Sequence, residues 1–188
     1  MSTPTDGVKQ LVLPVSELCH QPGASRRLQL EFEAPAGLGG AVIAIPPGSP
    51  VELAVLLESV MEGILASGQL SAGATGQCVR CLESVELPIE VTFQELYSYP
   101  ERALATATAN QDPTDTLEVI DQAVDLNRPV RDAMVLALPF QPLCQPACPG
   151  LCATCGELLV DPADHQHNQV DPRWSPLEQI LKTQVEES

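Results

Sequence analysis

The stretch Val51-Glu-Leu-Ala-Val-Leu-Leu-Glu-Ser-Val-Met-Glu-Gly-Ile-Leu-Ala-Ser-Gly-Gln-Leu-Ser-Ala-Gly73 decides the fold class of this chain. Every second residue from Val51 to Leu57 is apolar, which is typical of a half-buried strand. A helical spacing is also present, at Leu56, Val60 and Ile64. Of the two interpretations we adopt the first, and we predict two strands that meet near Glu62-Gly63.

Further strands are predicted on both sides of this stretch. Residues Leu28 to Phe32 alternate between apolar and polar, and Ala41 to Ile45 form a short apolar run that ends at Pro46-Pro47-Gly48. Residues Leu82 to Tyr97 read as another strand, which is broken or lies at a sheet edge at Pro88, because proline has no N–H for a central ladder.

The clearest helix is predicted from Asp125 to Leu138. Asp125 can cap its start, Pro129 falls in its tolerant first turn, and Pro139 ends it. Apolar residues recur at every fourth position: Leu126, Val130, Met134 and Leu138. A second short helix is predicted at about residues 176–185.

The acidic charge limits the classes of partner. The 188 residues include 25 acidic and nine basic ones, for a formal charge of −16. Direct, strong RNA binding is disfavoured, because nucleic-acid binders present a basic face to the phosphates. The nearest to such a feature in the ordered part is the pair Arg128 and Arg131, the candidate contact for RNA or a partner. No membrane span or signal peptide is recognisable, so we expect a cytoplasmic protein.

The cysteines fall into three close groups, with Cys19 set apart: Cys78-Val-Arg-Cys81, Cys144-Gln-Pro-Ala-Cys148 and Cys152-Ala-Thr-Cys155-Gly156. Such spacings suit zinc, because a tight turn can direct two thiolates at one ion about 2.3 Å away. In a reducing compartment a disulfide framework is not expected.

Six cysteines and the two histidines of Asp164-His165-Gln-His167 make eight ligands, the number for two tetrahedral zinc sites. The preferred partition is Cys152, Cys155, His165 and His167 for one ion, and Cys78, Cys81, Cys144 and Cys148 for the other. A rival partition gives one ion to Cys144, Cys148, Cys152 and Cys155 and leaves the rest free. The alternative for the two histidines is that they belong to a solvated polar loop and bind no metal.

The predicted fold class is therefore α+β: a mainly antiparallel β-sheet with one principal helix and a zinc-stabilised C-terminal tail. Residues 1–24 are predicted to be a loose N-terminal leader. Residues 25–148 form the α+β core, with a mobile loop at 101–116. Residues 149–188 form the zinc-binding tail with the short helix.

Catalysis is not expected. A catalytic zinc keeps an open coordination position, whereas both proposed sites are closed by four protein ligands. No nucleophile elbow or phosphate loop is present. A thioredoxin-like redox pair at Cys78 and Cys81 remains an alternative, although that motif needs a helix N-terminus and these residues follow a predicted strand.

Four motifs in this order resemble the YceD family of bacterial and plastid proteins. They are Cys78-Val-Arg-Cys81-Leu82, the stretch Asp125 to Pro139, Cys148-Pro-Gly-Leu-Cys-Ala-Thr-Cys-Gly156, and Asp171-Pro-Arg-Trp174. The resemblance spans about residues 28 to 184 and implies a role in accumulation or processing of large-subunit ribosomal RNA. Many members have Cys-x-Cys where this chain has His165-Gln-His167, which implies a ligand role for both histidines.

Three functions of different classes follow. The first is a non-enzymatic ribosome-biogenesis factor that binds a ribosomal protein or a large-subunit precursor particle. The second is a zinc-binding regulatory adaptor unconnected to ribosomes. The third is a thiol oxidoreductase that uses Cys78 and Cys81.

Overall fold

The structure is a computed structural model that describes residues 11–101, 117–160, 165 and 167. Contacts divide the chain into two compact units, Met1–Cys144 and Gln145–Ser188. The boundary falls four residues before the one predicted between core and tail. Among the described residues, no helix has the length and apolar character needed to cross a membrane.

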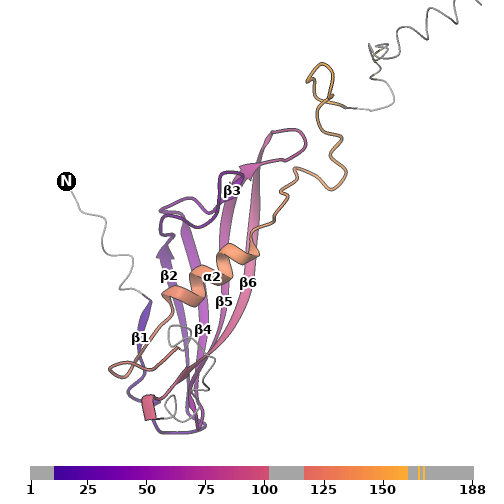
Figure 1. Ribbon diagram of the computed structural model, residues 1–188. Coiled ribbons are helices and arrows are strands. Elements are labelled where there is room, and N and C mark those ends of the chain that lie inside the picture. Colours follow the sequence, from indigo (N-terminus) through magenta and orange to yellow (C-terminus); the bar gives the residue numbers. More distant parts are fainter. Residues whose placement is uncertain (1–10, 102–116, 161–164, 166, 168–188) are drawn as a thin grey trace, which may run out of the picture. The chain divides into compact units, whose positions relative to one another are not determined.

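The first unit is built on a five-stranded antiparallel sheet (Figure 1). Along it run β2 (Ser25–Glu33), β4 (Pro50–Ser59), β5 (Gly63–Gln77) and the short β3 (Ile43–Ala44), and β6 (Ser84–Ser98) pairs with the other edge of β5. All pairs are antiparallel. The prediction of a mainly antiparallel sheet with one principal helix is confirmed.

The predicted pair of strands within residues 51–73 is also confirmed. Strands β4 and β5 pair from Val51 opposite Ala72 to Ser59 opposite Ile64. The alternating apolar residues of β4, from Val51 to Leu57, are buried. The two-residue period, and not the helical spacing, therefore corresponds to the observed structure. A Cβ at Gly63 would lie 1.9 Å from the Tyr97 carbonyl oxygen, which explains the glycine where β5 begins beside β6.

Strand β6 shows why a proline is compatible with this sheet. The strand continues unbroken through Pro88, which lies opposite Gly73 of β5. Among the described strands β6 pairs only with β5, so it is an edge strand, and the missing N–H of Pro88 removes no central hydrogen bond. Of the two predicted outcomes at Pro88, edge placement is the one observed.

Helix α2 (Asn127–Ala137) packs against β6 on one face of the sheet (Figure 1). The predicted apolar stripe is confirmed, because Leu126, Val130 and Met134 are buried in the core and Leu138 packs against it. Leu138 has an extended conformation, as expected for a residue before proline.

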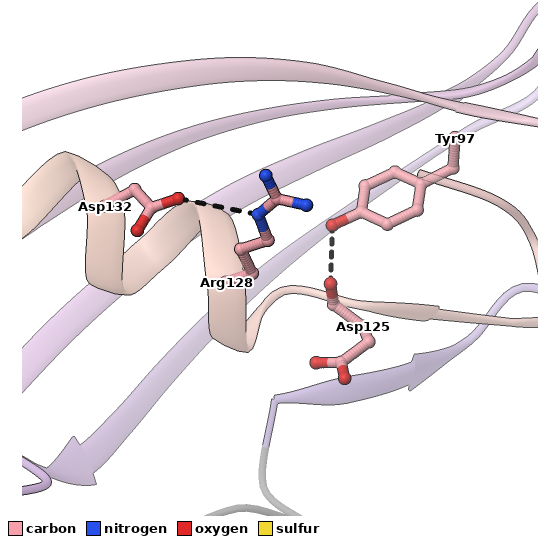
Figure 2. A network of polar contacts seen from close by, with 4 residues as sticks. All are labelled: Tyr97, Asp125, Arg128 and Asp132. Carbon is pink, nitrogen blue, oxygen red and sulfur yellow. Dashed lines mark hydrogen bonds and ion pairs between the residues drawn. The ribbon is translucent and has the colours of Figure 1, made fainter. Parts of the chain in front are cut away.

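The start of α2 differs in one detail from the prediction. The N-cap residue is Leu126 instead of Asp125. The Asp125 carboxylate nevertheless accepts a hydrogen bond of 2.9 Å from the Asn127 backbone N–H. Figure 2 shows two further contacts nearby: the Tyr97 hydroxyl donates a 2.6 Å hydrogen bond to the Asp125 carbonyl oxygen, and Arg128 lies 3.7 Å from Asp132.

The prediction of a loose leader over residues 1–24 is wrong from Leu11 onward. Strand β1 (Val12–Pro14) pairs with β7 (Ala123–Asp125) in a second, two-stranded sheet. The side chains of Leu11, Leu13 and Val15 are buried in the core. A strand of three residues is too short to show a period, and its partner strand is more than 100 positions away, so no local pattern distinguishes it from a loop. The predicted loop at 101–116 (beyond Glu101) and the helix at 176–185 lie outside the described residues.

Candidate metal centres

Cys78 and Cys81 lie in the turn that joins β5 to β6. The Cys78 N–H donates to the Glu83 carbonyl, at 2.8 Å, and the Leu82 N–H donates to the Cys78 carbonyl, at 2.9 Å. Leu82 has a φ of 62°, a left-handed conformation that reverses the chain directly after Cys81. The turn therefore presents both sulfurs at one end of the hairpin.

Cys144 reaches the same end of the hairpin. The Val79 N–H donates to the Pro142 carbonyl, at 3.0 Å, and the Cys81 and Cys144 sulfurs are 3.6 Å apart without a disulfide. Two sulfurs bound to one tetrahedral zinc at about 2.3 Å are about 3.8 Å apart. With Cys148, the four sulfur atoms lie within 4.8 Å of one another. We call these four residues the first cluster.

Backbone donors favour the thiolate form of Cys78. Burial raises the pKa of this thiol, but N–H groups of Cys144, Cys81 and Arg80 direct hydrogen bonds at the sulfur and lower its pKa to about 6. A thiol that ionises readily suits both a redox centre and a metal ligand. The grouping of four sulfurs around one point favours the metal ligand.

The second cluster, in the second unit, consists of Cys152, Cys155, His165 and His167. Its first half is a short turn: the Cys152 N–H donates to the Glu157 carbonyl and the Gly156 N–H to the Cys152 carbonyl, both at 2.8 Å. Gly156 has a φ of 75°, which a glycine adopts without strain. The glycine after Cys155 therefore closes the turn that brings the two sulfurs together.

The ligand atoms of the second cluster also lie close together. The Cys155 sulfur lies 3.2 Å from His165 Nε2, which lies 2.8 Å from His167 Nε2. All four ligand atoms lie within 4.8 Å of one another. Nitrogen and sulfur together in a tetrahedral arrangement are the donor set that zinc prefers.

The two thiols of the second cluster differ in acidity. Backbone N–H groups of Cys155 and Thr154 lower the pKa of Cys152 to about 6. The Glu157 N–H lowers the pKa of Cys155, but burial and the neighbouring Cys152 thiolate raise it above the ordinary value. Cys152 therefore loses its proton readily, and a cation between the two sulfurs would promote loss of the proton of Cys155.

Each predicted ligand set thus lies together in the structure, and the four cysteines of the rival partition are divided between the clusters. Metal binding itself stays a prediction. Four protein ligands per cluster leave no open position for a substrate, so the arrangement suits a structural ion. Sequence reasoning did not identify Glu157, whose backbone N–H and carboxylate face Cys155; its only signal was its place directly after Cys155-Gly156.

The remaining candidates, Cys19, Arg128 and Arg131, belong to neither cluster. Cys19 is partly buried against the core, and burial raises its pKa. Arg128 and Arg131 are exposed on α2, and Arg128 pairs with Asp132. The charge of Arg128 is therefore partly compensated by the Asp132 carboxylate.

Comparison with known proteins places this architecture in a family. No solved structure matches the chain. Uncharacterized proteins of Mycobacterium tuberculosis and Mycobacterium bovis are each 38% identical over 171 residues, which cover 91% of this chain and 81% of theirs. An uncharacterized protein of Mycobacterium leprae is 35% identical over 178 residues, 95% of this chain and 81% of its own.

A family model described as "Large ribosomal RNA subunit accumulation protein YceD" matches residues 66–181, a range that contains α2 and every ligand of both clusters. The match extends over more than half of the chain. With the long alignments to the mycobacterial relatives, it shows that this chain belongs to the YceD family.

Proposed function

We propose that this protein is a non-enzymatic factor in ribosome biogenesis that supports accumulation or processing of large-subunit ribosomal RNA. The observation that carries the proposal is the family match over residues 66–181. The charge of −16 favours an indirect action on the RNA, through a basic protein component of the precursor particle.

Zinc has a structural part in this proposal. Each cluster supplies four ligands, and the lowered pKa values of Cys78 and Cys152 favour the thiolate that binds the ion. In the first cluster zinc would fix the turn between β5 and β6 to Cys144. In the second it would hold the segment from Cys152 to His167, whose described residues include no buried apolar side chain.

Sedimentation of a cell extract tests the proposal. We expect the tagged protein to migrate with large-subunit precursors, and its depletion to lower large-subunit ribosomal RNA relative to small-subunit RNA. A protein that stays at the top of the gradient, in cells whose RNA ratio is unchanged after depletion, would instead support a regulatory adaptor unconnected to ribosomes.

A further inference from the structure

The sheet has two unlike faces. On one face, alternate residues of β4, β5 and β6 are buried in the core. The residues between them point to the opposite face, and no other part of the described chain covers that face. We call this second surface, formed by the outward side chains of β2, β4, β5 and β6, the open face. Its middle strand offers small side chains, such as Ser67, Ser71 and Gly73.

One end of the open face is strongly acidic. The register places Glu31 opposite Glu52, Glu52 opposite Ser71, and Ser71 opposite Glu90, in one row across four strands. Two further carboxylates, Glu33 and Glu86, flank this row and are exposed with it. We call these five glutamates the acidic end.

This arrangement lowers the stability of the isolated sheet. Glu31 and Glu52 are directly opposed, and like charges on paired strands repel each other. The basic residue on the outward side of these strands is Arg27, opposite Leu56, about 13 Å along β4 from Glu52. A cationic partner would relieve the repulsion.

Three glutamates of the acidic end line a hollow of about 580 Å³. Its lining includes Glu52, Glu86 and Glu90 around Ser71, Gly73 and Thr75. A Cβ at Gly73 would meet no atom within 4 Å, so the floor of the hollow is backbone that a partner can approach closely. The surface therefore has a recess as well as a charge.

The geometry selects the class of occupant. The backbones of Glu52 and Glu90 are two strands apart, about 10 Å, so the carboxylates of the acidic end are spread over a wider area than the ligands of one metal ion. Nucleic acid carries the same sign of charge. The chain's own remaining segments carry no net positive charge: residues 1–10 hold one acidic and one basic residue, 102–116 two and one, 161–164 two and none, and 168–188 four and two.

We propose that the acidic end of the open face is a docking site for a Lys/Arg-rich polypeptide segment of a protein partner. The inference rests on the proposed function, for which it names the contact surface. The glutamates span about 14 Å across the strands and about 13 Å along them, so several cations of one short segment can be paired at once.

Binding of a fluorescent peptide of alternating lysine and threonine tests the site, with a glutamate-for-lysine peptide as the control ligand. The triple variant Glu52→Gln, Glu86→Gln and Glu90→Gln should weaken binding roughly tenfold, because each exposed pair contributes up to about 1 kcal/mol. The matched variant Glu17→Gln, Glu62→Gln and Asp121→Asn removes the same charge from exposed sites elsewhere and should change binding by less than about twofold.

Gly73→Leu tests the hollow at unchanged charge. It should also weaken binding several-fold, and the space at Gly73 allows the fold to be retained, which circular dichroism checks. Equal losses in both triple variants, or an unaffected Gly73→Leu variant, would overturn the site.

Sedimentation of the same variants separates this inference from the proposed function. If the wild-type protein and the Glu52/Glu86/Glu90 variant migrate with precursors to the same extent, the docking site is refuted and the proposed function is not. If peptide binding depends on these glutamates but the protein does not migrate with precursors, the ribosomal function is refuted and the docking site is not.

Discussion

At the scale of single residues, the acidity of each thiol follows from the backbone around it. Cys152 accepts hydrogen bonds from the N–H groups of a tight turn, and these lower its pKa to about 6. For Cys19 burial is the cause of the shift, and it raises the pKa. Two cysteines of comparable exposure are therefore expected to react very differently near neutral pH.

Alkylation of the metal-free protein by iodoacetamide should show this difference. Because the thiolate is the nucleophile, modification of Cys152 should increase as the pH rises through about 6, whereas Cys19 should react only at clearly higher pH. Mass spectrometry of the modified peptides measures both rates in one sample. Parallel pH profiles would contradict the role assigned to the turn.

The same lowered pKa has a consequence for stability. Unfolding returns Cys152 to its ordinary pKa of 9.0, so the unfolded state binds a proton between about pH 6 and 9 that the folded state does not. The contribution of the Cys152 thiol to the free energy of unfolding is therefore complete above pH 9 and decreases as the pH falls toward 6. In that window metal-free protein should gain stability as the pH rises.

Substitution of one ligand tests the metal count. Cys155→Ser should lower bound zinc from about two ions per chain to about one, since serine is a poor zinc ligand. Metal analysis under reducing conditions gives the count, and Cys19→Ser is the matched control. Limited proteolysis should show cleavage after residue 148 with the sheet still protected. Global unfolding of the variant would show that the second cluster has been assigned to the wrong part of the fold.

At the scale of elements, helix α2 stabilises the unit through one face only. Met134 is 1% exposed in the core, and Leu136, two positions on, is 84% exposed. The apolar stripe with a four-residue spacing therefore identifies the side chains that matter, and apolar character alone does not.

Alanine substitutions at these two positions make a matched pair. Met134→Ala should lower the free energy of unfolding by about 2–5 kcal/mol, because it removes buried contacts and leaves a cavity. Leu136→Ala should change it by about 0.5 kcal/mol or less. Urea unfolding followed by circular dichroism measures both. A similar loss in the two variants would show that α2 does not pack as described.

At the scale of the whole molecule, we expect the net charge to govern the choice of partner. With −16 overall and Arg128 paired to Asp132, naked ribosomal RNA should bind weakly or not at all near physiological salt. Binding should appear when a basic ribosomal protein or a precursor particle is added. Filter binding or gel shift across a salt series measures this.

Charge reversal on α2 identifies the binding mode. Arg128→Glu combined with Arg131→Glu should hardly change association with the particle, because the proposed contact is the acidic end of the open face. Tight binding to bare RNA that this double variant abolishes would refute the protein-partner mechanism.

The amino-acid sequence alone was sufficient to predict the elements whose signal is local. The two-residue period of β4, the four-residue stripe of α2 and the Cys-x-x-Cys turns depend on neighbours within one strand, one helix or one turn. Cysteine spacing likewise indicated which ligands belong together, because a turn of four residues already sets the distance between two sulfurs.

The features that join distant segments became visible in the three-dimensional fold and not in the sequence. The pairing of β1 with β7 and the row Glu31, Glu52, Ser71 and Glu90 depend on strand register, which no short window of sequence contains. A glutamate on an exposed strand reads as ordinary surface. It becomes part of a charged docking surface only when the sheet brings other glutamates beside it, because the repulsion depends on distance in space and not along the chain.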